Sequence, residues 1–116
     1  MRKVLVVDDE KAFKEMMRRM LERYSLDVRT AEDGEKGFEL VSKEKFDLII
    51  ADYLMPKMNG LEFFEQCHQQ FPNLPLIMIS GHLPDDWNGP GHISFLKKPF
   101  PLYKLDILVK EALKDE

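Results

Sequence analysis

Short runs rich in apolar residues alternate along this chain with stretches in which apolar residues recur every three or four positions. The apolar runs predict buried strands, and the recurring pattern predicts helices with one apolar face. The predicted strands cover residues 4–7, 48–51, 76–79 and 93–96, and the more polar segment 26–31 predicts a further, weaker strand. The predicted helices cover about 13–24, 35–42, 61–71 and 102–114. Strands that are apolar on both faces favour a parallel sheet covered by helices on each side, so the alternation predicts a doubly wound α/β fold.

The apolar positions of the helices predict which side chains enter the core. In the first helix these positions are Phe13, Met16, Met17, Met20, Leu21 and Tyr24. In the helix after Asn59-Gly60 they are Leu61, Phe64, Cys67, His68 and Phe71. In the last helix they are Leu105, Leu108, Val109, Ala112 and Leu113. We expect the methionines to fill gaps in the core and Cys67 to behave as a small buried hydrophobe.

Length and composition favour one domain over residues 1–116, with no linker, repeat or output domain. The net charge of −4 argues against nucleic-acid binding through bulk charge. A single cysteine excludes an intrachain disulfide and favours a reducing cytoplasm, where we expect the protein to reside. The first apolar run, residues 4–7, is ended at once by acidic residues and is too short for the apolar segment of a signal peptide. No run approaches the roughly 18 apolar residues of a membrane span.

Acidic residues follow two of the predicted strands. Asp8 and Asp9 come after the first strand, and Asp52 comes after the third. Carboxyl ends of parallel strands meet at one edge of the sheet, where ligands of such folds bind. If these two strands are neighbours, three carboxylates converge, and such clusters are relieved by protonation or by a cation. Oxygen-only ligands favour Mg²⁺ over zinc.

Two further strands end in groups that suit a phosphoryl ligand. Ser80 ends the fourth strand, and Lys97-Lys98-Pro99 ends the fifth. A hydroxyl, an ammonium group, carboxylates and a hard cation can together position a phosphoryl group and neutralise its oxygens. An aspartate carboxylate can also be the nucleophile and form an acyl phosphate. Each carboxylate taken alone could equally be a solvated loop residue, but their joint placement at the strand ends favours a site.

These residues stand in segments that resemble the response-regulator receiver domains of two-component signalling, particularly single-domain regulators of the chemotaxis kind. The segments are Val7-Asp8-Asp9-Glu10, the stretch 52–60, Ser80-Gly81 and Phe95-Leu96-Lys97-Lys98-Pro99-Phe100. The resemblance covers essentially the whole chain. It implies a flavodoxin-like sheet of five parallel strands in the order 2-1-3-4-5.

The resemblance also implies a role for each residue of the site. Asp52 would be the phosphoacceptor. Mg²⁺, with Mn²⁺ as a substitute, would be held by Asp8, Asp9, Asp52 and the backbone carbonyl of Leu54.

Ser80 would hydrogen-bond the phosphoryl group and Lys98 would form a salt bridge to it, with Lys97 as the rival lysine. The peptide bond before Pro99 would be cis, and Phe95 would be the aromatic switch residue.

The chain departs from the family pattern between Ser80 and Phe95. Two prolines and two glycines in residues 82–92 oppose the full helix that the family places there, so we expect a shortened or irregular fourth helix. Trp87 in this segment could contact a partner or cap the helix. Family side chains at the positions of Leu54 and His82 tune the lifetime of the acyl phosphate. Because Leu54 cannot orient water, we expect a long lifetime.

The function expected from the resemblance is signalling in a bacterial-type phosphorelay. A sensor histidine kinase or a histidine phosphotransfer protein would donate the phosphoryl group. The protein, a monomer or weak dimer, would contact a downstream protein effector and would bind neither nucleic acid nor membrane. It would not be an enzyme beyond its own phosphorylation and dephosphorylation. One alternative is an interaction module that works without phosphorylation. Another is a magnesium-dependent phosphohydrolase of the haloacid dehalogenase kind, but that class needs an acid where this chain has Leu54.

Overall fold

Strands and helices alternate along the chain in the computed structural model, which describes residues 1–81 and 93–114. In order, the elements are β1 (Lys3–Val7), α1 (Lys11–Glu22), β2 (Asp27–Ala31), α2 (Gly34–Lys43), β3 (Leu48–Asp52), α3 (Gly60–Gln70), β4 (Leu76–Ser80), β5 (Ile93–Lys97) and α4 (Leu102–Ala112). Each predicted strand and helix is present within a few residues of its expected bounds. The irregular helix expected within residues 82–92 lies outside the described residues, as do His82 and Trp87.

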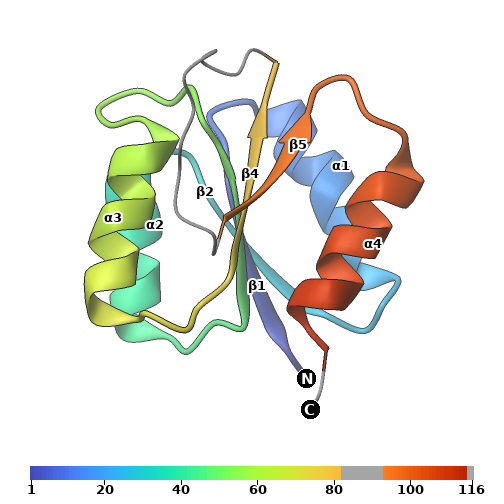
Figure 1. Cartoon of the computed structure of the whole chain (residues 1–116), viewed down its shortest axis with the longest axis horizontal. Coiled ribbons are helices and arrows are strands. Elements are labelled where there is room, and N and C mark those ends of the chain that lie inside the picture. Colours follow the sequence, from blue (N-terminus) through green and yellow to red (C-terminus); the bar gives the residue numbers. More distant parts are fainter. Residues whose placement is uncertain (82–92, 115–116) are drawn as a thin grey trace.

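The five strands form one parallel sheet in the order β2-β1-β3-β4-β5, which confirms the predicted fold (Figure 1). Strand β1 lies between β2 and β3, and Val7 at its end pairs with Ala51 of β3. The residues that follow this pair, Asp8 and Asp52, therefore lie side by side at the carboxyl ends of neighbouring strands, with Asp52 as the last residue of β3.

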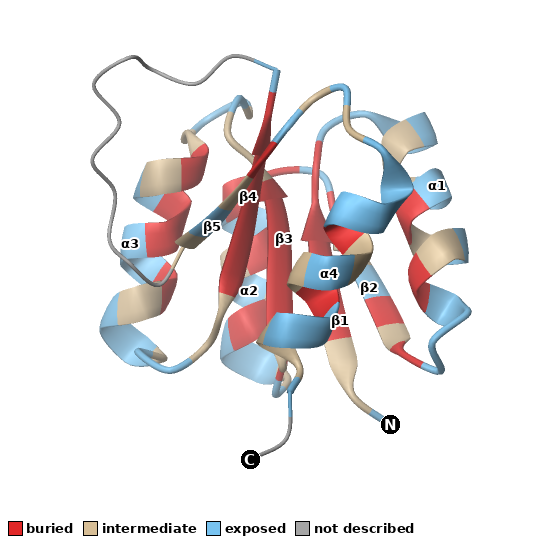
Figure 2. Ribbon diagram, turned by 45° about the vertical axis from the view of Figure 1, so that its right-hand side comes forward, coloured by how far each residue is buried: buried red, intermediate tan, exposed pale blue. Residues whose placement is uncertain are grey.

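Alternate residues of the strands enter two apolar clusters, one on each face of the sheet. Val4 and Val6 of β1 pack with α1 and α4, whereas Leu5 and Val7 pack with α2 and α3. Figure 2 shows the central strands buried along their length and the helices buried only on the side that faces the sheet. Burial on both faces explains why these strands are apolar except at their ends. None of the helices in the described ranges is long and apolar enough to cross a membrane.

The predicted helix faces are right in part. In α1, Met17 and Leu21 are fully buried, but Met16 is 45% exposed and Tyr24 is 43% exposed. Met16 lies at the margin of the helical stripe. Tyr24 comes after the helix ends, where its hydroxyl donates a hydrogen bond to Asp106 at the surface. In these positions the core prediction was wrong.

Two other helices show the same mixture. The most deeply buried side chain of α3 is Phe63, which the predicted face omitted, while Leu61, His68 and Phe71 are only half-buried. The helix turns residues 60, 63, 64 and 67 towards the sheet, which is a regular helical stripe displaced from the predicted one. In α4, Leu105 and Val109 are buried, and the other three predicted positions pack at the edge of the core.

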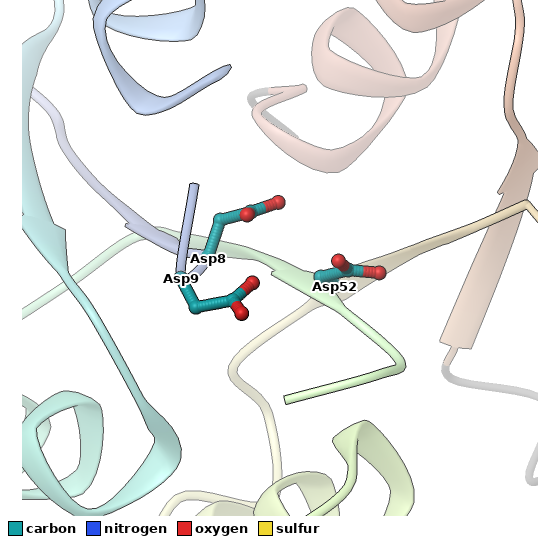
Figure 3. Close-up of side chains that lie close together, drawn as sticks. All are labelled: Asp8, Asp9 and Asp52. Atoms are coloured by element: carbon teal, nitrogen blue, oxygen red, sulfur yellow. The ribbon is translucent and has the colours of Figure 1, made fainter. Parts of the chain in front are cut away.

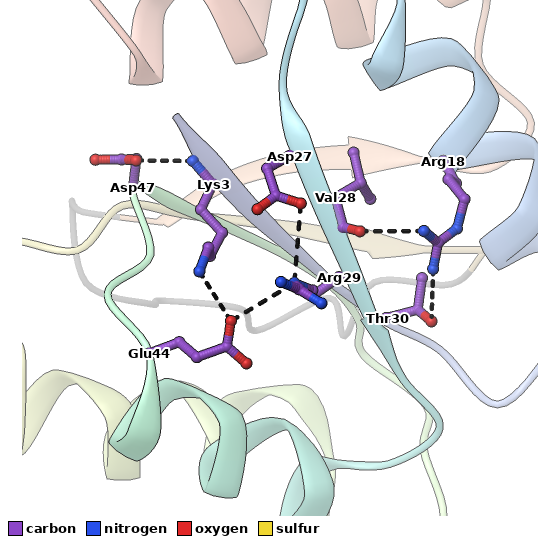
Figure 4. A network of polar contacts seen from close by, with 8 residues as sticks. All are labelled: Lys3, Arg18, Asp27, Val28, Arg29, Thr30, Glu44 and Asp47. Carbon is purple, nitrogen blue, oxygen red and sulfur yellow. Dashed lines mark hydrogen bonds and ion pairs between the residues drawn. The ribbon is translucent and has the colours of Figure 1, made fainter. Parts of the chain in front are cut away.

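A polar network runs along the edge strand β2 and ties it to α1, to the start of β1 and to the end of α2 (Figure 4). The Glu44 carboxylate pairs with the Lys3 ammonium at 2.9 Å and with the Arg29 guanidinium at 3.5 Å. Arg18 of α1 donates to the backbone carbonyl of Val28 at 3.2 Å. Charged side chains along an edge strand also discourage pairing with another chain.

The segment between β3 and α3 is held close to the sheet by Gly60. Its backbone N–H donates to the carbonyl of Tyr53 at 2.7 Å. A Cβ atom at this position would lie 2.9 Å from the Cα of Tyr53, 3.0 Å from the carbonyl oxygen of Asp52 and 2.4 Å from the sulfur of Met78. The methionine could move, but the backbone of β3 could not move without displacing Asp52.

We therefore expect Gly60→Ala to lower the free energy of unfolding by about 1–3 kcal/mol, as overpacking does, although alanine favours helices. Urea unfolding followed by circular dichroism would measure the change. Gly81→Ala is the matched control, because no described atom lies within 4 Å of a Cβ there. Equal stability of Gly60→Ala and the wild type would contradict the close approach.

The lone thiol offers a test of the core on the α2 and α3 side. Cys67 is 3% exposed, and burial raises the pKa of its thiol to about 12. Because only the thiolate reacts, we expect the native protein to resist a thiol reagent at pH 8 and to react fully in urea. The only cysteine gives an unambiguous signal. Rapid labelling of the folded protein would show that this part of the core is open.

Candidate functional site

Three carboxylates meet at the carboxyl ends of β1 and β3, and we call Asp8, Asp9 and Asp52 the acidic site. One oxygen from each lies within 4.8 Å of the others. Figure 3 shows the three side chains side by side, two from the end of β1 and one from β3. The parallel pairing of the two strands produces this convergence. The Asp8 backbone N–H also continues the sheet by donating to the carbonyl of Ala31 at 3.1 Å.

The members of the acidic site differ in exposure. Asp8 is fully buried, the Asp52 side chain is 12% exposed and Asp9 is exposed. Burial raises the pKa of Asp8, the negative charges of Asp52 and Asp9 raise it further, and the backbone N–H of Glu10 and the Lys98 ammonium oppose them. Burial likewise raises the pKa of Asp52 against the Lys98 ammonium and the backbone N–H of Leu54. Both carboxylates thus sit where their negative charge is incompletely compensated.

The acidic site fits a hard divalent cation. Asp8 Oδ1 accepts the backbone N–H of Glu10 at 2.8 Å, but the buried Oδ2 has no hydrogen-bond partner among the described residues. A buried carboxylate oxygen without a donor is costly, and a cation would satisfy it. The three candidate ligands supply only oxygen, the donor that Mg²⁺ prefers. The residues present therefore suit Mg²⁺ better than zinc.

A lysine that directly follows the edge strand β5 brings a positive charge to the acidic site. The Lys98 ammonium nitrogen lies 3.7 Å from Asp8 Oδ2 and 3.8 Å from Asp52 Oδ2. Its backbone N–H donates to the carbonyl of Ser80 at 2.8 Å, and its peptide bond to Pro99 is cis. Lys97 is exposed on β5. Of the two lysines left open by the sequence, the structure brings Lys98 to the acidic site.

The other predicted positions have distinct surroundings. Ser80 is fully buried at the end of β4. Phe95 is half-buried in β5 and packs against the cluster on the α2 and α3 face. Leu54 is 65% exposed just beyond Asp52. His82 lies outside the described residues.

Sequence reasoning missed one neighbour of this site. Phe13 was placed on the apolar face of the first helix, and it does pack against the core there. Its ring, however, also lies beneath the Lys98 ammonium, 4.1 Å from nitrogen to ring centroid. Phe13 and Lys98 stand near opposite ends of the chain, so no local pattern joins them. The only available signal was that Phe13 follows closely after Asp8 and Asp9.

Comparison with known proteins gives a consistent result over nearly the whole chain. The model of the response regulator receiver domain matches residues 4–110. The alkaline phosphatase synthesis transcriptional regulatory protein PhoP of Bacillus subtilis is 33% identical over 118 residues, which cover 97% of this chain and 49% of PhoP. Response regulator protein PilR of Pseudomonas aeruginosa is 34% identical, covering 97% of this chain and 26% of PilR. The chain thus spans half or less of the length of these relatives.

Solved structures agree with the sequence relatives. Response regulator protein TrrA of Thermotoga maritima, in complex with Mg²⁺-BeF, has a TM-score of 0.89 at 27% identity, covering 97% of this chain and all of that one. Chemotaxis response regulator CheY4 of Vibrio cholerae has a TM-score of 0.87 at 30% identity, covering 97% and 99% of the two chains. With its parallel sheet and acidic site, the chain belongs to the response regulator receiver family, a signalling domain of two-component systems.

Proposed function

We propose that this protein is a phosphorylation-dependent signalling module that accepts a phosphoryl group on Asp52. The observation that carries the proposal is the pairing of the acidic site with the Lys98 ammonium. The Asp52 carboxylate is nearly buried, lies 3.8 Å from the Lys98 ammonium nitrogen and is beside the carboxylates of Asp8 and Asp9. Asp52 thus has one positively charged partner, the Lys98 ammonium, and a bound metal ion would be a second. Membership of the family implies a histidine kinase partner.

The reaction would be a transfer between two side chains. A carboxylate oxygen of Asp52 attacks the phosphorus of a phosphohistidine, the phosphorus–nitrogen bond breaks, and the imidazole leaves with the bonding electrons and takes up a proton. The product is an acyl phosphate, and positioning and charge neutralisation supply most of the rate. Lys98 would pair with a phosphoryl oxygen, and the Ser80 hydroxyl would donate to another. The donor would be a sensor histidine kinase or a histidine phosphotransfer protein.

Mg²⁺ would be held by Asp8, Asp9, Asp52 and the backbone carbonyl of Leu54. When bound, it supplies positive charge that offsets the charge on the phosphoryl oxygens. Two observations support this: the oxygen-only ligand set with its unsatisfied Asp8 Oδ2, and the presence of Mg²⁺-BeF in the structure of the relative TrrA. Mn²⁺, which has similar ligand preferences, would substitute for it.

The output of the module would be a change of shape away from the acidic site. Phosphorylation adds charge and acceptor oxygens, which would draw Ser80 towards them. Phe95, on the neighbouring strand, would then move into the space that Ser80 leaves. A modification shifts such an equilibrium only by favouring one of two states. A downstream protein, or a segment joined to this domain, would recognise the new surface in the cytoplasm.

The first test is the mass of the intact protein after incubation with acetyl phosphate, with and without Mg²⁺. We expect a gain of one phosphoryl group in the wild type with Mg²⁺, and none after chelation or in Asp52→Asn. Asp106→Asn, which changes an aspartate on α4, is the matched control and should react like the wild type. No gain under any condition would favour the interaction module. Continued turnover of an added phosphoester would favour a phosphohydrolase.

The exposed Leu54 generates a prediction about lifetime. Leu54 follows two residues after Asp52, and its exposed apolar side chain cannot orient a water molecule for hydrolysis of the acyl phosphate. We expect Leu54→Asn to speed loss of the phosphoryl group by up to about tenfold, below the 10²–10⁴-fold of a full general base. The decay can be followed by mass after removal of the donor, with Leu54→Met as the control. A slower decay in Leu54→Asn would contradict the role of Leu54.

A further inference from the structure

The Lys98 ammonium is close to two carboxylates without being hydrogen-bonded to either. Its distances of 3.7 Å to Asp8 Oδ2 and 3.8 Å to Asp52 Oδ2 exceed the 2.7–2.9 Å or so of a charge-assisted hydrogen bond. The side chain is 26% exposed and has a flexible four-carbon stem. Coulomb attraction alone would draw it into direct contact with the carboxylates. Another group must therefore contribute to its position.

The ring of Phe13 is that group. The ammonium nitrogen lies 4.1 Å from the ring centroid, whereas the other two lysine–ring contacts among the described residues are at 5.9 Å. A cation over an aromatic face is attracted by the negative face of the ring. The ring itself is fixed, because Phe13 stands in the first turn of α1 and packs against the core cluster of that face.

We propose that Phe13 is a positioning residue that holds the Lys98 ammonium beside the acidic site and out of direct contact with it. This role rests on the proposed function, and it explains how one lysine can serve the reaction without blocking it. An ammonium bonded directly to Asp52 would occupy the oxygen that attacks phosphorus. Held by the ring, the ammonium stays within reach of an incoming phosphoryl oxygen without a direct hydrogen bond to Asp8 or Asp52.

The geometry can be tested without metal or phosphodonor. Protons above an aromatic face resonate upfield, so we expect the Lys98 ε-methylene protons to be shifted upfield in NMR spectra of the wild type. Phe13→Leu should return them to the ordinary lysine position, and Phe13→Trp, which keeps an aromatic face, should retain the shift. Ordinary lysine shifts in the wild type would overturn the contact, whatever the protein does with phosphate.

The kinetic test uses the rate of phosphorylation at a subsaturating concentration of acetyl phosphate with Mg²⁺. A cation–π contact at a partly exposed site corresponds to about a two- to tenfold effect, so we expect a fall of that size in Phe13→Leu. Phe13→Trp should restore the rate. In a Lys98→Met background, Phe13→Leu should cause no further fall. Met20→Ala perturbs the same core cluster seven residues further along α1, and it should react at the wild-type rate.

The outcomes separate the two proposals. A wild type that takes up no phosphoryl group would overturn the proposed function, and the role of Phe13 with it. Normal phosphorylation of the wild type with an unchanged rate in Phe13→Leu would overturn the role of Phe13 alone. An equal fall in Phe13→Leu and Met20→Ala, or a further fall in the Lys98→Met background, would reduce Phe13 to a packing residue.

Discussion

The parallel pairing of β1 with β3 is the constraint on which the site depends. Because Val7 lies opposite Ala51, the residues that follow this pair lie side by side at the carboxyl edge of the sheet, and in this chain both are acidic. Two apolar clusters cover both faces of the sheet and hold this register. A slip of one residue would turn every strand side chain to the opposite face, which the core does not permit. The packing of the core therefore enforces the crowding of negative charge.

Three further residues, Lys98, Phe13 and Gly60, shape the surroundings of the crowded carboxylates. Lys98 lies at the acidic site because its backbone N–H is hydrogen-bonded to Ser80 at the end of β4. Phe13 lies there because α1 starts directly after the aspartates. Gly60 allows the segment after Asp52 to turn back closely against β3. These three residues stand in different strand–helix connections at the carboxyl edge of the sheet. The α/β fold therefore brings residues that are distant in the sequence to one site.

Sequence reasoning succeeded where a local pattern has a single physical cause. Apolar runs predicted the three central strands, because a strand buried on both faces needs them, and the positions of the aspartates followed from where β1 and β3 end. The strand order came from the resemblance, since no local signal states which strands are neighbours. The buried faces of the helices were harder to predict. In α3, for example, a small rotation of the helix removes Leu61 from the buried stripe and brings Phe63 into it. The ring beneath Lys98 could not be predicted, because it joins residues near opposite ends of the chain.

The incomplete neutralisation of the acidic site distinguishes it from a structural ion pair. A structural pair would close into direct hydrogen bonds, since a buried polar atom left without a partner costs about 1–3 kcal/mol. Here no donor from the described residues reaches Asp8 Oδ2, while an ammonium group lies 3.7 Å away over an aromatic ring. Unsatisfied buried groups and raised carboxylate pKa values concentrate at functional sites. An arrangement that keeps carboxylate oxygens open and a cation close by is suited to charges that arrive and depart, as a metal ion and a phosphoryl group do.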